Sequence, residues 1–540
     1  MLFDFIVRKL RFWSSIKKAK SNAGASEHSD TPEAKMDKAL MSNLDGLKSL
    51  FTNSSDLKIH VFRFGPDNGI PAALAYIDGL VNEQILSDAI LHPLMLWHAD
   101  SAFLPSGTDL MDMVKQEVLW TADVKTVSSI SELAAGCLNG NTALMIDGCP
   151  SSLSISAKGF EKRSVTTPQT ETVVRGPREG FTENLRTNTS LIRRKIRDAH
   201  LHVEQMILGR KTQTVVCLMY LEGVANPKIV ETVKGRIERL DVEAIFETGY
   251  IEEYIEDAPF SPFATIGYSE KPDVVAANIL EGRIAIVVDG TPFVLTVPML
   301  FIESFQSAED YYARPLYASL VRILRFLAYL IAVFAPAVFI ALSSFHHELI
   351  PTTLLFTIAK ARGGTPFPVF VEALIMIFAF EILREAGIRL PQPIGQAISI
   401  VGALIMGDAA VSAGLVGAPM VITIALTAVA SFLVPTQNDS ISILRIVMTI
   451  PTAFVGFYGL AMGALAVLVH LASLESFGVP YFDSFDSADD AKDTLIRAPL
   501  WTMLKRPKGI ARGDTTRSHF FIPPLRPFAP DDDIPERRKS

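Results

Sequence analysis

Cysteine is scarce in this chain: the 540 residues include three, Cys137, Cys149 and Cys217. No two of them form a Cys-x-x-Cys pair, so the sequence offers neither a disulfide framework nor a zinc site. All three precede the most apolar part of the chain, and isolated cysteines of this kind are typical of a reducing cytosol. We therefore expect no structural disulfide and no bound metal.

Positive charge is also limited, because 50 lysines and arginines face 58 acidic residues and give a formal net charge of -8. This balance argues against general nucleic-acid binding, for which basic faces are needed. The sequence also has no glycine-rich phosphate loop, no cofactor fingerprint and no recognisable nucleophile–base pair, and His346-His347-Glu348 is not a metalloprotease motif. We expect neither an enzyme nor a cofactor.

Charge of either sign becomes sparse between Phe326 and Leu474, although both flanks are polar. A helix that crosses a bilayer needs about 20 apolar residues. We predict an α-helical multi-pass membrane domain at 313–476, and its candidate spans are Phe326–Phe345 with a kink at Pro336, Ile394–Ala413, Met420–Val434 and Ile446–Leu474. Val369–Arg389 is apolar but carries charges, and Leu349–Ala359 is too short to span comfortably.

Of the acidic residues inside this apolar region, three are of interest as possible functional groups: Glu372, Glu381 and Asp408. An intramembrane carboxylate is a functional-site hypothesis by default, so all three are candidates for a pore or ion path. The spacing of Glu381 from Arg384 and Glu385 allows ionic interactions within one helix. Glu372 has no such partner on its own helix. The alternative is that Glu372 bonds a backbone, serine or threonine group on a neighbouring helix.

Both ends of the chain are predicted to lie on the cytosolic side of the membrane. The N-terminal region has no export signal and the tail after Gly478 is basic, so both are predicted to be cytosolic. Two ends on one side require an even number of spans. The candidate segments give an even number if Leu349–Ala359 crosses the membrane and an odd number if it is re-entrant.

The polar N-terminal region contains an internal duplication. Leu74–Leu86, "LAYIDGLVNEQIL", matches Leu218–Val230, "LMYLEGVANPKIV", and Leu133–Pro150, "LAAGCLNGNTALMIDGCP", matches Val275–Pro292, "VAANILEGRIAIVVDGTP". Each copy reads as a strand, a turn and a helix, followed later by a second helix, a tight turn and a strand. This alternation predicts two duplicated α/β lobes, at 41–172 and 211–312.

Both copies end in Asp-Gly-x-Pro, at Asp147-Gly148 and Asp289-Gly290. We interpret these dipeptides as hairpin turns, because glycine supplies a positive φ and aspartate can bond its own backbone. A catalytic role for the two aspartates is the weaker alternative, since the turn explains them.

An arginine-rich stretch, "VVRGPREGFTENLRTNTSLIRRKI", lies between the lobes in the connector region 173–210. It lacks phosphate-loop spacing, and from Thr182, the expected N-cap, it reads as a helix. We expect its arginines to meet carboxylates across a lobe or subunit interface, and they are Arg175, Arg178, Arg186, Arg193 and Arg194. The alternative is a solvated helix. The ends of the chain read as a basic segment with a disordered linker at 1–40 and a cytosolic tail at 477–540.

Several stretches together resemble one known family. They include "EKRSVTTPQTETVVRGPREGFTENLRTNTSLIRRKI", "SAEDYYARPLYASLVRILRFLA", "PFPVFVEALIMIFAFEILREAGIRLPQPIGQAISIVGALIMGDAAVSAGLV" and "DTLIRAPLWTMLKRP". The chain is similar over roughly Leu57 to Lys508 to the A subunits of spore germination nutrient receptors, the GerA family of endospore-forming bacteria. The N-terminal extension and the tail after Lys508 depart from shorter members.

The resemblance implies a multi-pass protein of the spore inner membrane that acts with a transporter-like B subunit and a lipoprotein C subunit. It also implies a homo-oligomeric ring, a pentamer, whose membrane helices form a nutrient-gated cation channel. Such a ring would repeat each intramembrane carboxylate and so favour cations. The alternatives are a regulatory or scaffolding paralogue that acts with the dipicolinic-acid release machinery, and a secondary transporter with inverted repeats in its membrane part.

Overall fold

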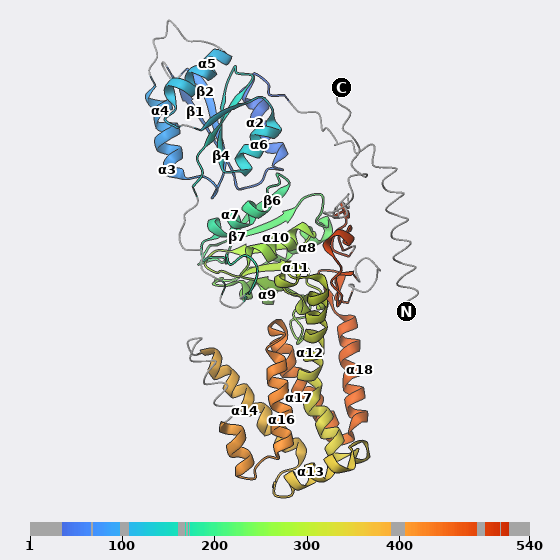
Figure 1. The fold of residues 1–540 in the computed structure, drawn as a ribbon. Helices are drawn as coiled ribbons and strands as arrows, with labels where there is room; N and C mark the ends of the chain where they lie inside the picture. The colour runs from blue at the N-terminus through green and yellow to red at the C-terminus, as the bar shows by residue number, and fades with distance from the viewer. Residues whose placement is uncertain are drawn as a thin grey trace, which may run out of the picture. The chain divides into compact units, whose positions relative to one another are not determined.

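The structure is a computed structural model of the chain (Figure 1). It describes residues 35–65, 69–97, 107–121, 123–159, 168, 171, 173–389, 405–482, 492–507 and 509–517. The chain divides into two compact units, Met1–Phe160 and Glu161–Ser540. Most of the predicted basic N-terminal segment, the first part of the predicted span Ile394–Ala413 and the end of the tail lie outside the described residues.

The first unit contains a five-stranded sheet in the order β1-β2-β4-β5-β3, in which every neighbouring pair is antiparallel. Its strands are β1 (Leu57–Phe64), β2 (Ile70–Ile77), β3 (Val124–Val127), β4 (Asn141–Ile146) and β5 (Ser152–Ser156). Two helices pack on one face, α2 (Leu40–Leu50) and α6 (Ile130–Leu138) (Figure 1). The other face is covered by α3 (Glu83–Ile85), η2 (Leu86–Leu91), α4 (His92–Leu96), α5 (Thr108–Met113) and η4 (Val114–Val118).

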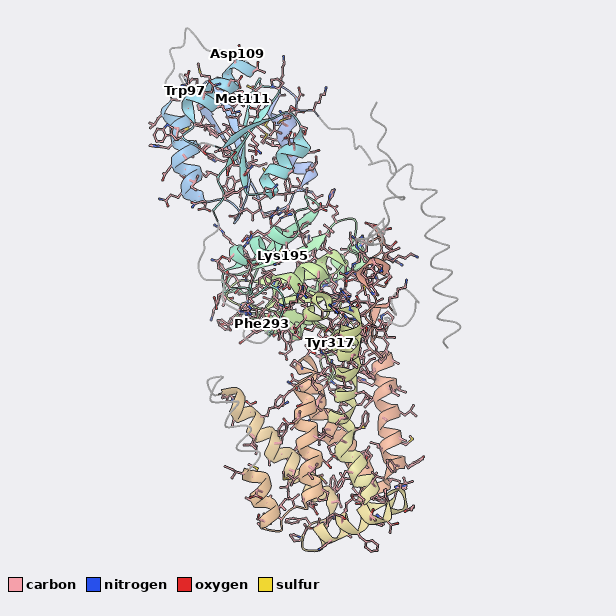
Figure 2. All side chains as sticks on the ribbon, in the orientation of Figure 1. Trp97, Asp109, Met111, Lys195, Phe293 and Tyr317 are labelled. Carbon is pink, nitrogen blue, oxygen red and sulfur yellow. The ribbon has the colours of Figure 1, made fainter. Side chains whose placement is uncertain are left out.

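Alternation along the strands divides the core of this lobe into two layers, since successive side chains point to opposite faces. Leu74 and Leu144 join the layer under α4 and α5, where Met111 also lies and the Trp97 ring packs 5.8 Å from that of Phe64 (Figure 2). Cys137 of α6 is on the opposite face, and its Sγ donates to the carbonyl of Ala75. Burial raises the pKa of this thiol to about 12, which makes it unreactive.

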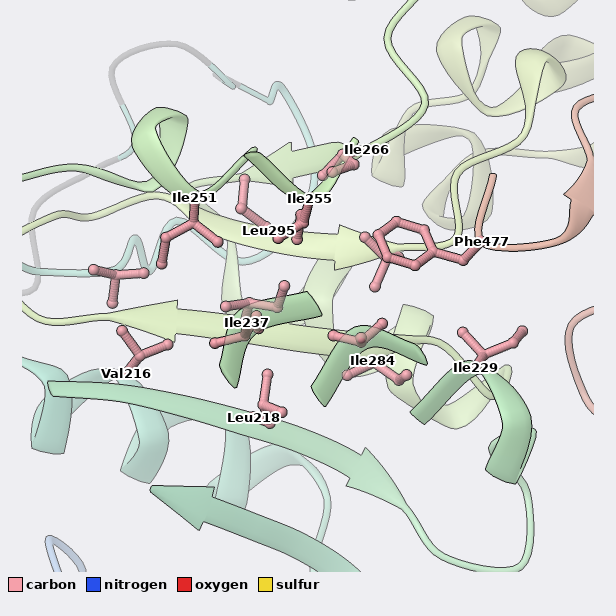
Figure 3. Close-up of a cluster of buried hydrophobic side chains, with 14 of the residues drawn as sticks. Val216, Leu218, Ile229, Ile237, Ile251, Ile255, Ile266, Ile284, Leu295 and Phe477 are labelled. Carbon is pink, nitrogen blue, oxygen red and sulfur yellow. The ribbon is translucent and has the colours of Figure 1, made fainter. Parts of the chain in front are cut away.

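The second lobe repeats the first, with a five-stranded sheet in the order β6-β7-β9-β10-β8. Its elements are β6 (Leu201–Leu208), β7 (Thr214–Leu221), β8 (Gly267–Ser269), β9 (Ile284–Val288), β10 (Val294–Val297), α7 (Leu185–Lys195), α8 (Pro227–Glu238), α9 (Thr248–Ile255) and α10 (Pro272–Leu280). Registers also match, because Ala72 pairs with Ile146 and Val216 pairs with Val288. Figure 3 shows the isoleucine-rich core between this sheet and α8 and α9.

The predicted mixture of strands and helices in these lobes is confirmed, and so is the hairpin after each Asp-Gly. The role of the aspartates differs from the prediction. Asp147 Oδ1 accepts a hydrogen bond from the backbone N–H of Leu40, and Asp289 Oδ1 accepts one from that of Leu185. Each carboxylate therefore satisfies a free N–H in the first turn of a helix that precedes it in the chain, rather than its own backbone.

The arginine-rich helix is the second-lobe counterpart of α2. Asn188 exchanges hydrogen bonds with the backbone of Thr182, as Asn43 does with Asp37. The N-cap of α7 is Asn184, whose side chain accepts from the N–H of Thr187, so the prediction of Thr182 as N-cap was wrong. The helix packs on α10 and the sheet and thus belongs to the second lobe.

A helical bundle follows the second lobe (Figure 1). Its elements are η5 (Phe301–Phe305), α11 (Ala308–Tyr312), α12 (Pro315–Ser344), η6 (His347–Leu349), α13 (Thr352–Arg362), α14 (Val369–Arg389), helical residues 405–412, α16 (Ala418–Ser431), η7 (Pro435–Gln437), α17 (Asn438–Val455) and α18 (Phe457–Ser473). Among the described residues, α12 alone is by itself long and apolar enough to span a membrane. Ala418–Ser431 and Pro435–Val455 pass the same test together but are bent by 112°, and α18 is apolar but shorter.

The predicted long span Ile446–Leu474 is instead parts of two helices. The chain reverses at Gly456, whose φ of +62° is accessible to glycine at little cost. A Cβ at Gly459 would lie 2.2 Å from the carbonyl oxygen of Pro451, so the two helices meet through backbone. Small residues such as Gly459 allow helices to approach this closely. The prediction failed because apolar composition carries no signal of chain direction.

The segment after α18 returns to the second lobe instead of forming a simple tail. It contains β11 (Glu475–Ser476), β12 (Val479–Pro480) and η10 (Leu500–Thr502). Phe477 (Figure 3) and Ile510 belong to the isoleucine-rich core of the second lobe, and Ala511 forms a β-bridge with Ala225. The described part of the C-terminal segment therefore contributes side chains to the core of the second lobe. The bundle begins with α12 beside this lobe, and the chain returns to the lobe after α18.

We expect Ile510→Ala to destabilise the second lobe by about 3 kcal/mol, because the side chain is fully buried and its loss leaves a cavity. Thermal unfolding of the full chain in detergent checks this. The control is Ile496→Ala, whose side chain is exposed and whose effect should be within about 0.5 kcal/mol. Equal melting temperatures for the two variants would contradict the packing of the C-terminal segment on this lobe.

Candidate functional site

The junction between the second lobe and the bundle is organised by Arg322 of α12, which is completely buried. Its Nε donates to Asp310 Oδ2 at 2.9 Å, and its Nη1 donates to Asp493 Oδ1 at 2.9 Å. The same Nη1 also reaches the carbonyls of Asp493 and Thr494. The guanidinium therefore joins α11, α12 and the C-terminal segment in one contact. A buried arginine is tolerable only with such paired and hydrogen-bonded partners.

Further charged and aromatic groups surround this contact. Arg325 donates to both carboxylate oxygens of Asp310, and the hydroxyl of Tyr311 donates to Asp493 Oδ2 at 2.9 Å. The Tyr311 ring lies 5.3 Å from Arg322 and 5.8 Å from Arg497, within cation–π range. The sequence shows Arg322 and Arg325 just before the apolar run, but their acidic partners are too distant in sequence to be recognised.

A second ionic cluster lies within the bundle and includes Glu381. Its Oε2 lies 2.7 Å from Arg384 Nη2 on the same helix, as the spacing predicted, and its Oε1 lies 3.4 Å from Nη1 of Arg445 on α17. Arg445 is 1% exposed, and its Nε donates to the carbonyl of Ala332 on α12. That carbonyl is available because Pro336, four residues on, has no N–H to donate to it. Three helices are thereby linked by one arginine.

Glu372 has the neighbours that the alternative interpretation required. Its side chain is fully buried at the start of α14. Oε2 accepts from the backbone N–H of Gly417, the N-cap of α16, and Oε1 accepts from Thr365 and Arg362. A carboxylate at a helix N-terminus is favoured by the helix dipole. These partners supply a structural reason for an acidic residue in the apolar region.

The three predicted carboxylates do not share partners. Glu372 bonds the α16 N-terminus, Glu381 bonds α17, and Asp408 is exposed on the helical residues 405–412. Sequence reasoning missed Arg445 and Arg362, which neutralise two of them. The sequence did contain a signal for Arg445, which stands directly before the apolar run Ile446–Leu474. Burying a basic side chain there is as costly as burying a carboxylate, so Arg445 could have been expected to need a partner of opposite charge.

The predicted interface arginines separate into two groups. Arg193 is 1% exposed and donates to the carbonyl of Asp198, and Arg194 lies 3.6 Å from Glu179, which also meets Lys195. These contacts are all within the second lobe. The exposed group consists of Arg175, Arg178 and Arg186.

The Gly-Pro turn of the same stretch contacts the junction. A Cβ at Gly176 would lie 2.9 Å from the ring of Tyr312, and its φ of +144° also favours glycine. The hydroxyl of Tyr312 in turn donates to Asp273 Oδ2. The arginine-rich stretch and the segment that enters the bundle, far apart in sequence, therefore lie against each other.

This combination defines a class of protein: an α/β lobe with an exposed arginine-rich edge, joined through a buried charge network to an apolar helical bundle. A family model, Bacillus/Clostridium GerA spore germination protein, matches residues 45–509. The chain belongs to the GerA family of spore germination proteins, which includes receptor A subunits.

Individual relatives are similar over most of their length. Spore germination protein KA of Bacillus subtilis (strain 168) is 44% identical over 89% of this chain and 88% of its own. The uncharacterized membrane protein YfkQ of the same organism is 42% identical over 90% and 94%. The crystal structure of the N-terminal domain of the A subunit of the Bacillus megaterium spore germinant receptor GerK3 is 36% identical, with a TM-score of 0.39, and covers 50% of this chain and 98% of that domain.

We expect Arg445→Leu to reduce the free energy of unfolding by about 3 kcal/mol, because it leaves Glu381 with one cationic partner and the Ala332 carbonyl without a donor. Arg389→Leu removes an exposed pair with Glu385 and should cost less than about 1 kcal/mol. Thermal unfolding in detergent measures both. The double variant Arg445→Leu/Glu381→Leu should recover part of the loss, and a wild-type melting temperature for Arg445→Leu would exclude a structural pair.

Proposed function

We propose that this chain is the A subunit of a spore germinant receptor, and that it forms an oligomeric, nutrient-gated cation channel in the spore inner membrane. The proposal rests on family membership together with the ionic cluster in the bundle. Charged groups inside a membrane domain are costly and commonly mark ion pathways. The proposed partners of the chain are a transporter-like B subunit and a lipoprotein C subunit. Five copies of the chain itself are proposed to form a pentamer.

Glu381 is the carboxylate we propose for the ion path. In the present arrangement Arg384 and Arg445 neutralise it, as expected of a closed state. Separation of both Arg445 and Arg384 from Glu381 would leave one unpaired carboxylate per subunit and create a ring of negative charge that favours cations. Glu372, held by the α16 N-terminus, is better suited to holding the helices together. Asp408 is exposed and is proposed to meet a neighbouring subunit or the pore.

The exposed arginines of the second lobe support the oligomer part of the proposal. Arg175, Arg178 and Arg186 lie at the surface of the lobe, where carboxylates of another copy or of a partner subunit can approach them. Arg193 is not, because it is buried against its own lobe. Arginine is well suited to such contacts, because its guanidinium binds carboxylates through two parallel hydrogen bonds.

We further propose that the bundle is multi-pass, with an even number of crossings. The described part of the C-terminal segment packs on the second lobe from which α12 departs, and this packing supports a topology in which both lie on one side of the membrane. At the opposite end of α12, Gly456 of the α17–α18 turn lies against Phe345. Helices thus leave the lobe and return to it.

Cysteine labelling tests this topology, because Cys137, Cys149 and Cys217 are all buried and give little background. In right-side-out vesicles, a membrane-impermeant maleimide should label Thr353→Cys, in α13 at the far end of the bundle. Thr515→Cys, in the C-terminal segment, should be labelled only after permeabilisation. Labelling of both from the same side without permeabilisation would disprove a crossing of the membrane by α12 between the lobe and α13, and with it the proposed topology.

Flux measurements test the channel. The chain is reconstituted in liposomes with B and C subunits, and nutrient is added. We expect Glu381→Gln to reduce potassium flux about tenfold, which corresponds to about 1.4 kcal/mol of lost electrostatic stabilisation of the ion. The control Glu385→Gln changes an exposed carboxylate four residues away and should retain wild-type flux. No nutrient-dependent flux in any combination of subunits would reject the channel and favour the regulatory paralogue.

A further inference from the structure

A cavity of about 360 Å³ lies where the second lobe, the start of the bundle and the C-terminal segment meet. Its walls come from β8 and α10 of the lobe, α11, the corner before α17 and the C-terminal segment, and representative lining residues are Tyr268, Asp273, Met299, Tyr312, Thr436 and Leu500. This volume is within the range of small-molecule sites. A ligand bound in this cavity would contact both the second lobe and the bundle.

One wall of the cavity carries a carboxylate with unused hydrogen-bonding capacity. The side chain of Asp273 is 9% exposed, in the first turn of α10, where the helix dipole stabilises negative charge. Its Oδ2 accepts from the hydroxyl of Tyr312 at 2.6 Å, but Oδ1 has no hydrogen-bond partner among the described residues. The nearest cation, Lys271, lies 3.6 Å from Oδ2 and forms no hydrogen bond with it. An unpartnered buried oxygen of this kind costs free energy unless something binds it.

A second carboxylate, Glu171, lines the same cavity. Its Oε2 accepts from the hydroxyl of Ser269 at 2.6 Å. Burial raises the pKa of this carboxyl, and the Ser269 hydrogen bond and the charge of Lys271 only partly oppose the rise. A cation in the cavity would favour the ionised form of Glu171 and complete its solvation.

The arginines that line the cavity do not favour an anionic ligand. Arg283 and Arg517 line the cavity, but Arg283 bonds Glu281 and Glu303, and Arg517 bonds Glu281. Their charges are already neutralised. Nor do the described residues contain a group of three ligands that could hold a metal ion. Apolar side chains, Ile266, Met299 and Leu500, cover part of the remaining surface.

We propose that this cavity binds a small organic cation, a primary ammonium on a short apolar chain. The ammonium donates to the free Oδ1 of Asp273 and to Glu171, and tyrosine rings in the wall provide aromatic faces for the cation. The apolar chain lies against Ile266, Met299 and Leu500. The proposal does not depend on channel activity, because binding at this joint can be measured without ion flux.

Calorimetric titration of the full chain in lipid nanodiscs tests the site, with n-butylammonium chloride as the probe. We expect saturable binding that Asp273→Asn weakens about tenfold or more, since a charged hydrogen bond is lost. The matched control is Glu309→Gln on α11, a carboxylate outside the cavity lining, which should bind like the wild type. Binding should also weaken as the pH falls, because Glu171, whose pKa is raised by burial, becomes protonated and loses its charge.

A second variant separates loss of the site from a general folding defect. Ala277→Trp introduces a large side chain at the cavity wall and should abolish binding while the melting temperature without probe stays near that of the wild type. Sodium butyrate, which has a short apolar chain one carbon shorter and the opposite charge, should not bind. Equal binding of butyrate, absence of saturable heat with n-butylammonium, or unchanged binding in both Asp273→Asn and Ala277→Trp would each overturn the proposal.

Discussion

The buried guanidinium of Arg322 is the constraint on which the junction depends. Removing an arginine from water costs several kcal/mol, and this cost is offset only where its partners are in place. Those partners, Asp310 and the Asp493–Thr494 backbone, come from segments before α12 and after α18. Therefore α11, α12 and the C-terminal segment, which also packs on the second lobe, must assemble together. A movement of α12 cannot occur without a change in the contacts of the lobe.

The duplication explains why the arginine-rich stretch lies where it does. In the first lobe α2 enters over the sheet and is bonded by Asp147, and in the second α7 does the same with Asp289. The connector must therefore reach α7 along the edge of the second lobe, and Gly176 allows it to pass over Tyr312. The arginines of the stretch serve different purposes as a result. Arg193 stabilises the lobe, and Arg178 remains at the surface.

The sequence predicted features that depend on local pattern and missed those that depend on distant contacts. The repeated Asp-Gly turns and apolar runs were sufficient for two lobes of strands and helices. They did not reveal that every strand pair is antiparallel, or that Asp289 reaches a residue 104 positions away. Glu372 and its partner Gly417 are 45 positions apart, and Glu381 and Arg445 are 64 apart. Charge inside the apolar region was visible, but which charges neutralise one another depends on the fold.

Pro336 and Arg445 show how the bundle holds such charges. A proline inside a helix leaves a carbonyl without its donor, and a buried arginine needs acceptors. The carbonyl of Ala332 and the carboxylate of Glu381 meet both needs at one place. Arg445 of α17 forms an ion pair with α14 and a hydrogen bond with α12. Both contacts persist only while the three helices keep their relative positions, so the arrangement is sensitive to helix movement. Any shift that separates Arg445 from Glu381 and from the Ala332 carbonyl leaves the guanidinium without these partners in an apolar setting, which costs free energy.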